Sequence, residues 1–173
     1  MATGKDFEHY FKDSAEKQGI WVFRINDTFV KAKEYDSEAF VPQQACDFIL
    51  HEEEFLYMLE LKTTEKKYIT IHKDTAGMIK KHQYTQLYKR QGEKEIGGFI
   101  LQFERDTEEQ TTYFLDIRDF MRFLDESEKK SINRLDVVQY GGIVIEQAKF
   151  RGHWCYNVKK LLNKVKEDYY ERI

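Results

Sequence analysis

Three charged residues of this sequence have the types and spacing to act on a phosphate ester. Glu60 and Lys62 stand two positions apart at the end of the mostly apolar run 55–62. Residues two apart in a strand point to the same face, and apolar residues precede this pair on both faces, so we expect the pair in an interior environment. An unpaired charge buried there would cost several kcal/mol. The pattern therefore predicts a compensating partner for the pair, most simply a metal ion.

Asp47 could supply a second carboxylate to the same site. It begins the apolar segment 47–50, and the polar stretch 51–54 can turn the chain back as a hairpin, which would bring Asp47 beside Glu60. Two carboxylates suit a hard cation such as Mg²⁺, with Mn²⁺ as a substitute. Such an ion would polarise a phosphate and activate water, while Lys62 would orient that water or stabilise developing charge. A solvated Glu-Lys salt bridge is the alternative, but a surface strand should alternate polar and apolar residues.

Two predicted helices carry further polar candidates. Glu8 lies on the first, at 4–18, and could add an acidic ligand directly or through water, or could instead favour the positive N-terminal end of its own helix. Gln83 lies on the second, at 74–91, where its amide could hold the scissile phosphate or the water. A polar helix face explains Gln83 equally well.

The remaining pattern predicts an α/β domain with a mixed sheet and helices packed on it. Helical spacing is present at 4–18, 74–91, around Phe120, Phe123 and Leu124, and at 156–171. Strands are expected at 20–25, 47–50, 55–62, 68–71, 97–103, 112–115 and 142–145. The mixed, polar segment 26–46 is expected to project as a loop or an irregular hairpin. At 173 residues the chain is expected to form one domain, 1–173.

Composition excludes several classes of protein. A hydrophobic content of 41% and an aromatic content of 15% indicate a globular chain. No apolar run approaches the roughly 20 residues of a membrane span, and the polar N-terminus is unlike a signal peptide, so a cytoplasmic location and no membrane contact are expected. The two cysteines are too few for a disulfide framework. The five histidines form no zinc-hydrolase pair, and no glycine-rich loop marks a nucleotide site.

Basic residues offer candidate contacts to nucleic acid. The net charge of −3 does not itself indicate a nucleic-acid-binding protein, so the basic residues would have to gather on one face. Short basic clusters are also explained as solvated helix faces. The candidates for DNA contact are Arg24, Lys31, Lys33, Lys80, Lys81 and Arg151.

Taken in order, these residues resemble the PD-(D/E)xK nuclease superfamily, and within it the RecU type of Holliday junction resolvase. The similarity runs over most of the chain and includes Glu8, Asp47, Glu60-Leu61-Lys62-Thr63-Thr64, His82-Gln83, Gly97-Gly98-Phe99, Tyr113-Phe114-Leu115 and Lys130-Ser131-Ile132. The resemblance implies a restriction-endonuclease-like fold. It further implies metal ligation by Asp47 and Glu60, a metal or water contact from Glu8, catalysis by Lys62 and a supporting polar contact from Gln83. Its expected substrate is branched DNA, cut by a homodimer.

The sequence departs from this family in two places. Cys46 stands where the superfamily has its proline, and the segment 26–46 corresponds to a shortened form of the long stalk of RecU proteins. The second departure bears on junction selectivity and leaves phosphodiester cleavage intact. Three other functions stay open: a nuclease of restriction or repair type, a non-catalytic DNA-binding module on the same fold, and a protein-interaction domain that uses the aromatic residues.

Overall fold

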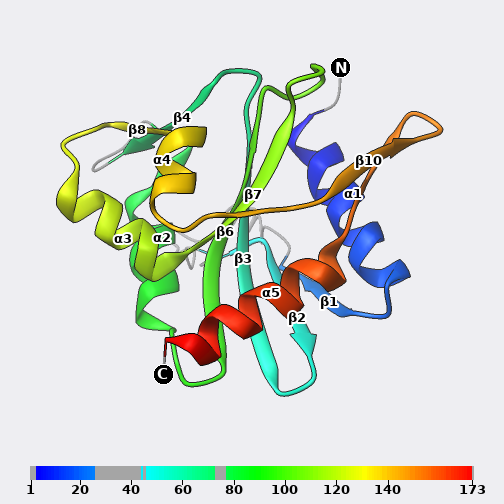
Figure 1. Ribbon diagram of the computed structural model, residues 1–173, viewed down its shortest axis with the longest axis horizontal. Coiled ribbons are helices and arrows are strands. Elements are labelled where there is room, and N and C mark those ends of the chain that lie inside the picture. Colours follow the sequence, from blue (N-terminus) through cyan, green and yellow to red (C-terminus); the bar gives the residue numbers. More distant parts are fainter. Residues whose placement is uncertain (1–2, 26–43, 45, 73–76, 173) are drawn as a thin grey trace, which may run out of the picture.

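The computed structural model describes residues 3–25, 44, 46–72 and 77–172. At its centre lies a six-stranded sheet with the order β1-β2-β3-β6-β7-β9 (Figure 1). Strands β3 and β6 are parallel, and the other neighbouring pairs are antiparallel. The strands of this sheet are β1 (Trp21–Arg24), β2 (Phe48–Glu52), β3 (Phe55–Thr63), β6 (Glu95–Phe103), β7 (Thr111–Asp116) and β9 (Ile143–Val144).

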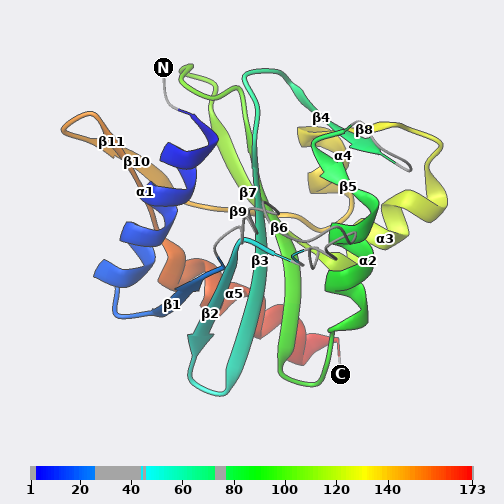
Figure 2. The ribbon, with the colours of Figure 1, turned by 180° about the vertical axis from the view of Figure 1, so that it is seen from behind.

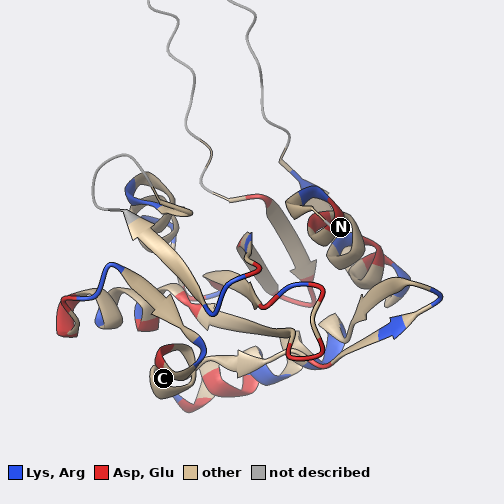
Figure 3. Ribbon diagram, turned by 90° about the horizontal axis from the view of Figure 1, so that it is seen from above, with Lys and Arg blue, Asp and Glu red and all other residues tan. Residues whose placement is uncertain are grey.

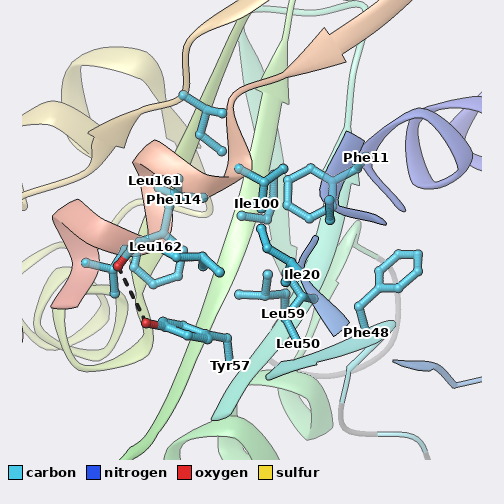
Figure 4. Packing of buried hydrophobic residues seen from close by; sticks show 14 of the residues in the cluster. Phe11, Ile20, Phe48, Leu50, Tyr57, Leu59, Ile100, Phe114, Leu161 and Leu162 are labelled. Atoms are coloured by element: carbon cyan, nitrogen blue, oxygen red, sulfur yellow. Dashed lines mark hydrogen bonds between the residues drawn. The ribbon is translucent and has the colours of Figure 1, made fainter. Parts of the chain in front are cut away.

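Helices cover both faces of this sheet, as Figures 1 and 2 show from opposite sides. One face packs against α1 (Gly4–Lys17) and α5 (Val158–Glu171), and the other against α2 (Lys81–Lys89) and α3 (Ile117–Glu126). Each face has its own buried apolar cluster; Figure 4 shows part of the first, where residues of the sheet meet residues of α1 and α5. The predicted fold class, a mixed central sheet flanked by helices, is confirmed.

The burial of β3 on both faces determines where its charged residues point. Tyr57 and Leu59 belong to the cluster under α1 and α5, whereas Met58 belongs to the cluster under α2 and α3. Because side chains alternate along a strand, Glu60 and Lys62 share the face of Met58. The two charged residues therefore point toward the side of the sheet covered by α2.

Smaller elements complete the described structure. A second sheet has the order β5-β4-β8, and a separate two-stranded hairpin pairs β10 with β11. Their bounds are β4 (Tyr68–His72), β5 (Ile79–Lys80), β8 (Ser131–Asn133), β10 (Gln147–Phe150) and β11 (His153–Tyr156), and a short helix, α4 (Arg134–Gln139), follows β8. Among the described residues, no helix is long and apolar enough to cross a membrane.

The largest error of the sequence interpretation concerns the predicted helix at 74–91. Residues 79–80 form strand β5 instead, which pairs in parallel with β4, and the helix begins at Lys81. Ile79 is fully buried in this arrangement, so packing against the second apolar cluster outweighed the helical spacing of its neighbours.

Three further differences lie near the C-terminus. The strand expected at 142–145 is only Ile143–Val144, and the β10–β11 hairpin was not predicted. The final helix begins at Val158 rather than at 156, because the Asn157 side chain accepts a hydrogen bond from the Lys160 N–H and caps the helix. The predicted projecting segment 26–46, with Lys31 and Lys33, lies almost wholly outside the described residues.

Candidate active site

The β2–β3 hairpin places Asp47 beside Glu60. Its register pairs Phe48 with Leu59, so Asp47, the residue directly before β2, stands opposite Glu60. The Asp47 N–H donates to the Leu59 carbonyl at 3.0 Å, and the Asp47 Oδ2 accepts from the Leu61 N–H at 2.7 Å. These two bonds fix Asp47 at the edge of β3, and the structure thus brings the two carboxylates predicted from the sequence together.

Glu60 is held by side chains from its own strand and from α2. Glu60 as a whole residue is 3% exposed, and its Oε1 lies 2.7 Å from the Lys62 Nζ. The same oxygen accepts a hydrogen bond from the Gln83 Nε2, while the Gln83 Oε1 accepts from the Lys80 N–H at 2.9 Å. Both ends of the Gln83 amide are therefore engaged, and its contact is with Glu60.

In this site, two carboxyl groups lie close together beside the Lys62 ammonium, which does not fully balance their charge, and both have raised pKa values. Burial raises the pKa of Asp47 to about 6, against the opposing hydrogen bond from Leu61 and the charge of Lys62. Burial, followed by the charge of Asp47, raises the pKa of Glu60 to about 7. Desolvation and like-charge repulsion both disfavour ionised carboxylates. A bound cation would relieve this cost.

The donor set fits a hard divalent ion that keeps part of its own hydration. Among the described residues, no group of three or more His, Cys, Asp or Glu side chains could hold a metal ion. Mg²⁺ is commonly bound by one or two carboxylates, with waters and substrate phosphate oxygens as its other ligands. Asp47 and Glu60 supply the two carboxylates that such a Mg²⁺ site needs.

Glu8 and Arg24 form an ion pair next to the two carboxylates. The Arg24 Nη2 lies 2.5 Å from the Glu8 Oε2, joining α1 to the end of β1. Glu8 lies close enough to contribute to the raised pKa of both Asp47 and Glu60. In this structure the charges of Glu8 and Arg24 are paired with each other. Metal ligation by Glu8 and DNA contact by Arg24 therefore stay predictions.

The other candidate DNA contacts fall in separate places. Lys80 and Lys81 are exposed where α2 begins, close to the Gln83 side chain that contacts Glu60. Arg151 is exposed in the β10–β11 turn, which projects past α1 on the side of the molecule seen at the right of Figure 1. These cations thus lie in separate regions of the described structure, and their contact with DNA stays a prediction.

His82, named with Gln83 in the sequence resemblance, is half-buried at the start of α2, and burial, with the charges of Lys80 and Lys62, lowers its pKa. One feature near the site was missed from the sequence. Behind the site, the Thr63 Oγ1 donates to the Gln102 Oε1 at 2.7 Å, and Gln102 is 1% exposed. A glutamine inside the apolar run 99–103 was the sequence signal for this buried polar contact.

Comparison with known proteins identifies the fold. No family model and no curated protein matches the sequence. Among solved structures, the chain is similar to Hjc, a Holliday junction resolvase from the archaeal hyperthermophile Archaeoglobus fulgidus, with a TM-score of 0.51 and 16% sequence identity. The alignment covers 81% of this chain and 94% of Hjc. This protein therefore shares the fold of an archaeal Holliday junction resolvase.

Proposed function

We propose that this protein is a Mg²⁺-dependent, structure-selective DNA endonuclease that resolves Holliday junctions by paired nicks. The observation that carries the proposal is that Asp47, Glu60 and Lys62 lie together at the β2–β3 hairpin of a resolvase-like fold, with Glu60 buried and the other two residues half-buried. One buried and one half-buried carboxylate that share a single ammonium are unfavourable in a purely structural role, because uncharged residues would pack there at lower cost. A role in metal binding and catalysis would explain why charged residues occupy these positions.

Each residue takes a defined part in the proposed reaction. Asp47 and Glu60 hold the cation, which when bound polarises the scissile phosphate and lowers the pKa of a water ligand. Lys62, placed 2.7 Å from the Glu60 carboxylate, orients the attacking water or stabilises charge that develops on the phosphate. Gln83 holds Glu60 in one orientation through its amide, as outer-shell partners of metal ligands do.

The proposed substrate is recognised by shape and charge rather than by base sequence. Lys80 and Lys81, exposed at the start of α2, are placed to contact phosphates beside the site. A homodimer is proposed because a twofold pair of subunits matches the symmetry of a four-way junction and gives two opposed nicks. The similarity to a resolvase supports this choice over a nuclease of restriction or repair type.

Cleavage of a labelled four-way junction, compared with a linear duplex of the same sequence, tests the proposal. The assay is run with Mg²⁺, with Mn²⁺ and with chelator. Wild type is compared with Lys62→Ala and with Lys67→Ala, a control that removes the same charge from a lysine whose side chain is 81% exposed. We expect paired symmetric nicks in the junction, abolished by chelator and by Lys62→Ala and retained in Lys67→Ala.

Other outcomes select the remaining functions. Cleavage of linear duplex in preference to the junction would leave a nuclease but exclude the resolvase assignment. Junction binding without cleavage under either metal would favour a non-catalytic DNA-binding module. Absence of binding to every DNA would favour a protein-interaction domain.

A further inference from the structure

The β10–β11 hairpin carries an unusual local composition. Residues 147–156 include Lys149, Arg151 and His153 and no acidic residue, in a chain with 31 acidic residues and a net charge of −3. Blue segments at and near the hairpin tip in Figure 3 mark its lysine and arginine. The hairpin is thus a local basic surface on an acidic protein, which is the charge pattern expected of a nucleic-acid contact.

Aromatic rings alternate with these cations. Phe150 is 63% exposed at the end of β10, and the Arg151 guanidinium lies 5.2 Å from the centre of its ring. On the other face of the hairpin, the Lys149 ammonium lies 5.8 Å from the centre of the Trp154 ring, its cross-strand partner. Cation-aromatic contacts hold the long side chains in place at the surface.

The turn itself favours a residue other than arginine. Phe150 pairs with His153, so Arg151 and Gly152 are the two turn residues, and their φ angles are 49° and 85°. Two-residue hairpin turns with positive φ at both positions prefer Asn-Gly, Asp-Gly or Gly-Gly. An arginine at the first position costs stability, and a charge displayed at the tip is a reason to keep it there.

The base of the hairpin is fixed, and its tip is exposed to solvent. The buried Tyr156 N–H donates to the Ser14 Oγ at 3.0 Å, and the Tyr156 hydroxyl accepts from the Gln102 Nε2 at 2.8 Å. The Gln147 Nε2 donates to the Gln110 carbonyl at 2.8 Å. These bonds tie both strands to α1 and to the central sheet, so that the exposed tip is held at a defined position relative to the active site.

Acidic groups on the adjacent helix lie near this surface without pairing with it. A groove of about 600 Å³ between α1 and the hairpin is lined in part by Asp6 and Asp13. Asp6 closes the capping box with Thr3, and the Asp13 carboxylate lies 3.4 Å from the His9 Nε2. Both carboxylates have partners on α1 or at its N-cap. The Arg151 guanidinium packs on the Phe150 ring, and among the described residues no ion pair joins it to a carboxylate.

We propose that the β10–β11 hairpin is a second DNA-binding element, separate from the active site, that grips a double-stranded arm of the substrate. Lys149 and Arg151 contact phosphates, and Phe150 packs on sugar and base edges in the major groove. The major groove of duplex DNA is wide enough to admit a two-stranded β-ribbon. This inference rests on the proposed function, since it assigns a second contact to the same DNA.

The decisive experiment measures affinity for four-way junctions whose arms are progressively shortened, in chelator, so that no cleavage occurs. The variants are Phe150→Ala, Arg151→Asn and their combination. Arg151→Asn is chosen because asparagine suits the turn, so it removes the charge without weakening the hairpin. Lys164→Ala is the control, since it removes one exposed positive charge from α5.

On long arms we expect Arg151→Asn to weaken binding roughly three- to tenfold and to lower the slope of log Kd against log salt by about one. The combined variant should bind more weakly still. The thermal unfolding midpoint of Arg151→Asn should be no lower than that of wild type. On arms too short to reach the hairpin, all proteins should bind alike. Lys164→Ala should match wild type at every arm length.

Two results would overturn the inference. Variants that bind every junction as wild type does would show that the hairpin does not contact DNA, while the proposed function would survive. A change in the sedimentation of the DNA-free protein, with DNA affinity unaltered, would assign the hairpin to a protein contact instead. Failure of wild type to bind any DNA is a separate result, because it refutes the proposed function itself.

Discussion

At the scale of single residues, the carboxylates of Asp47 and Glu60 that the proposed function needs are unfavourable for the stability of the fold. Burial raises the pKa of Asp47 from 3.8 to about 6, so the folded protein holds this proton more tightly than the unfolded chain does. The contribution of Asp47 to stability is therefore lost as pH rises from about 4 through about 6. At neutral pH the ionised carboxylate opposes folding unless a cation is bound.

Replacing Asp47 with Asn should stabilise the protein and abolish nicking. The amide oxygen can still accept the Leu61 N–H, while the repulsion with Glu60 is removed. In chelator at about pH 8, we expect urea unfolding to show a gain of about 1 kcal/mol. At about pH 5, where the wild-type carboxyl is protonated, the gain should shrink. A loss of stability at both pH values would contradict this account of the site.

Gln83 provides a second test at the residue scale. Its amide fixes the Glu60 carboxylate, so Gln83→Ala should lower the nicking rate about ten- to hundredfold and raise the Mg²⁺ concentration needed for half-maximal rate. Gln86→Ala is the matched control, because Gln86 lies on the same helix and contacts Arg90. Titration of Mg²⁺ with both variants checks the prediction, and equal effects of the two substitutions would refute it.

At the scale of elements, strand β6 must pass close to strand β7 and to helix α2. A Cβ at Gly98 would lie 2.3 Å from a Phe114 ring carbon and 2.7 Å from the Leu115 carbonyl oxygen. At Gly97 the nearest atom would be the Leu87 carbonyl oxygen at 3.3 Å. The glycine pair recognised in the sequence thus has a packing reason, and the two positions differ in how strictly they need it.

This difference predicts unequal costs for two alanine substitutions. Gly98→Ala should destabilise the protein by about 2 kcal/mol or more, because the added methyl overlaps a ring and a backbone atom. Gly97→Ala should change stability by no more than about 1 kcal/mol, since the lost flexibility of glycine offsets a slight overlap. Urea denaturation of both variants decides the matter. Similar midpoints for the two would mean that β6 can shift to accommodate a side chain.

At the scale of the whole molecule, the proposed homodimer makes a prediction about coordinated cutting. Wild type should convert a supercoiled plasmid bearing a cruciform into linear product, because two sites nick opposed strands. Adding an excess of Asp47→Asn protein should form mixed dimers with one active subunit, and the product should shift to nicked circles. Agarose electrophoresis over a range of mixing ratios measures this shift.

A monomeric enzyme gives a different dependence on the mixing ratio. Its linear product would fall only by competition for substrate, without the excess of nicked circles that mixed dimers produce. Unrelated inactive protein with the same net charge, added at equal concentration, controls for competition. Sedimentation of wild type in the absence of DNA then shows whether the dimer exists before substrate binds.

The sequence by itself determined strands β2 and β3 and the two carboxylates that they position. Long apolar runs ending in Glu60 and Lys62, and a polar turn of the right length, predicted a hairpin that the structure contains, because the period of a strand and the length of a turn are local properties. The fold class followed from the same spacing of apolar residues.

Tertiary packing alone decided what lies around those residues. Because β5 pairs with β4, helix α2 begins at Lys81 rather than at the predicted residue 74. With this start, the Gln83 side chain points toward Glu60. The ion pair between Glu8 and Arg24 joins residues from different elements, and the β10–β11 hairpin is fixed by contacts with α1 and the central sheet. Such contacts depend on how distant segments meet in space, which no local spacing of residues specifies.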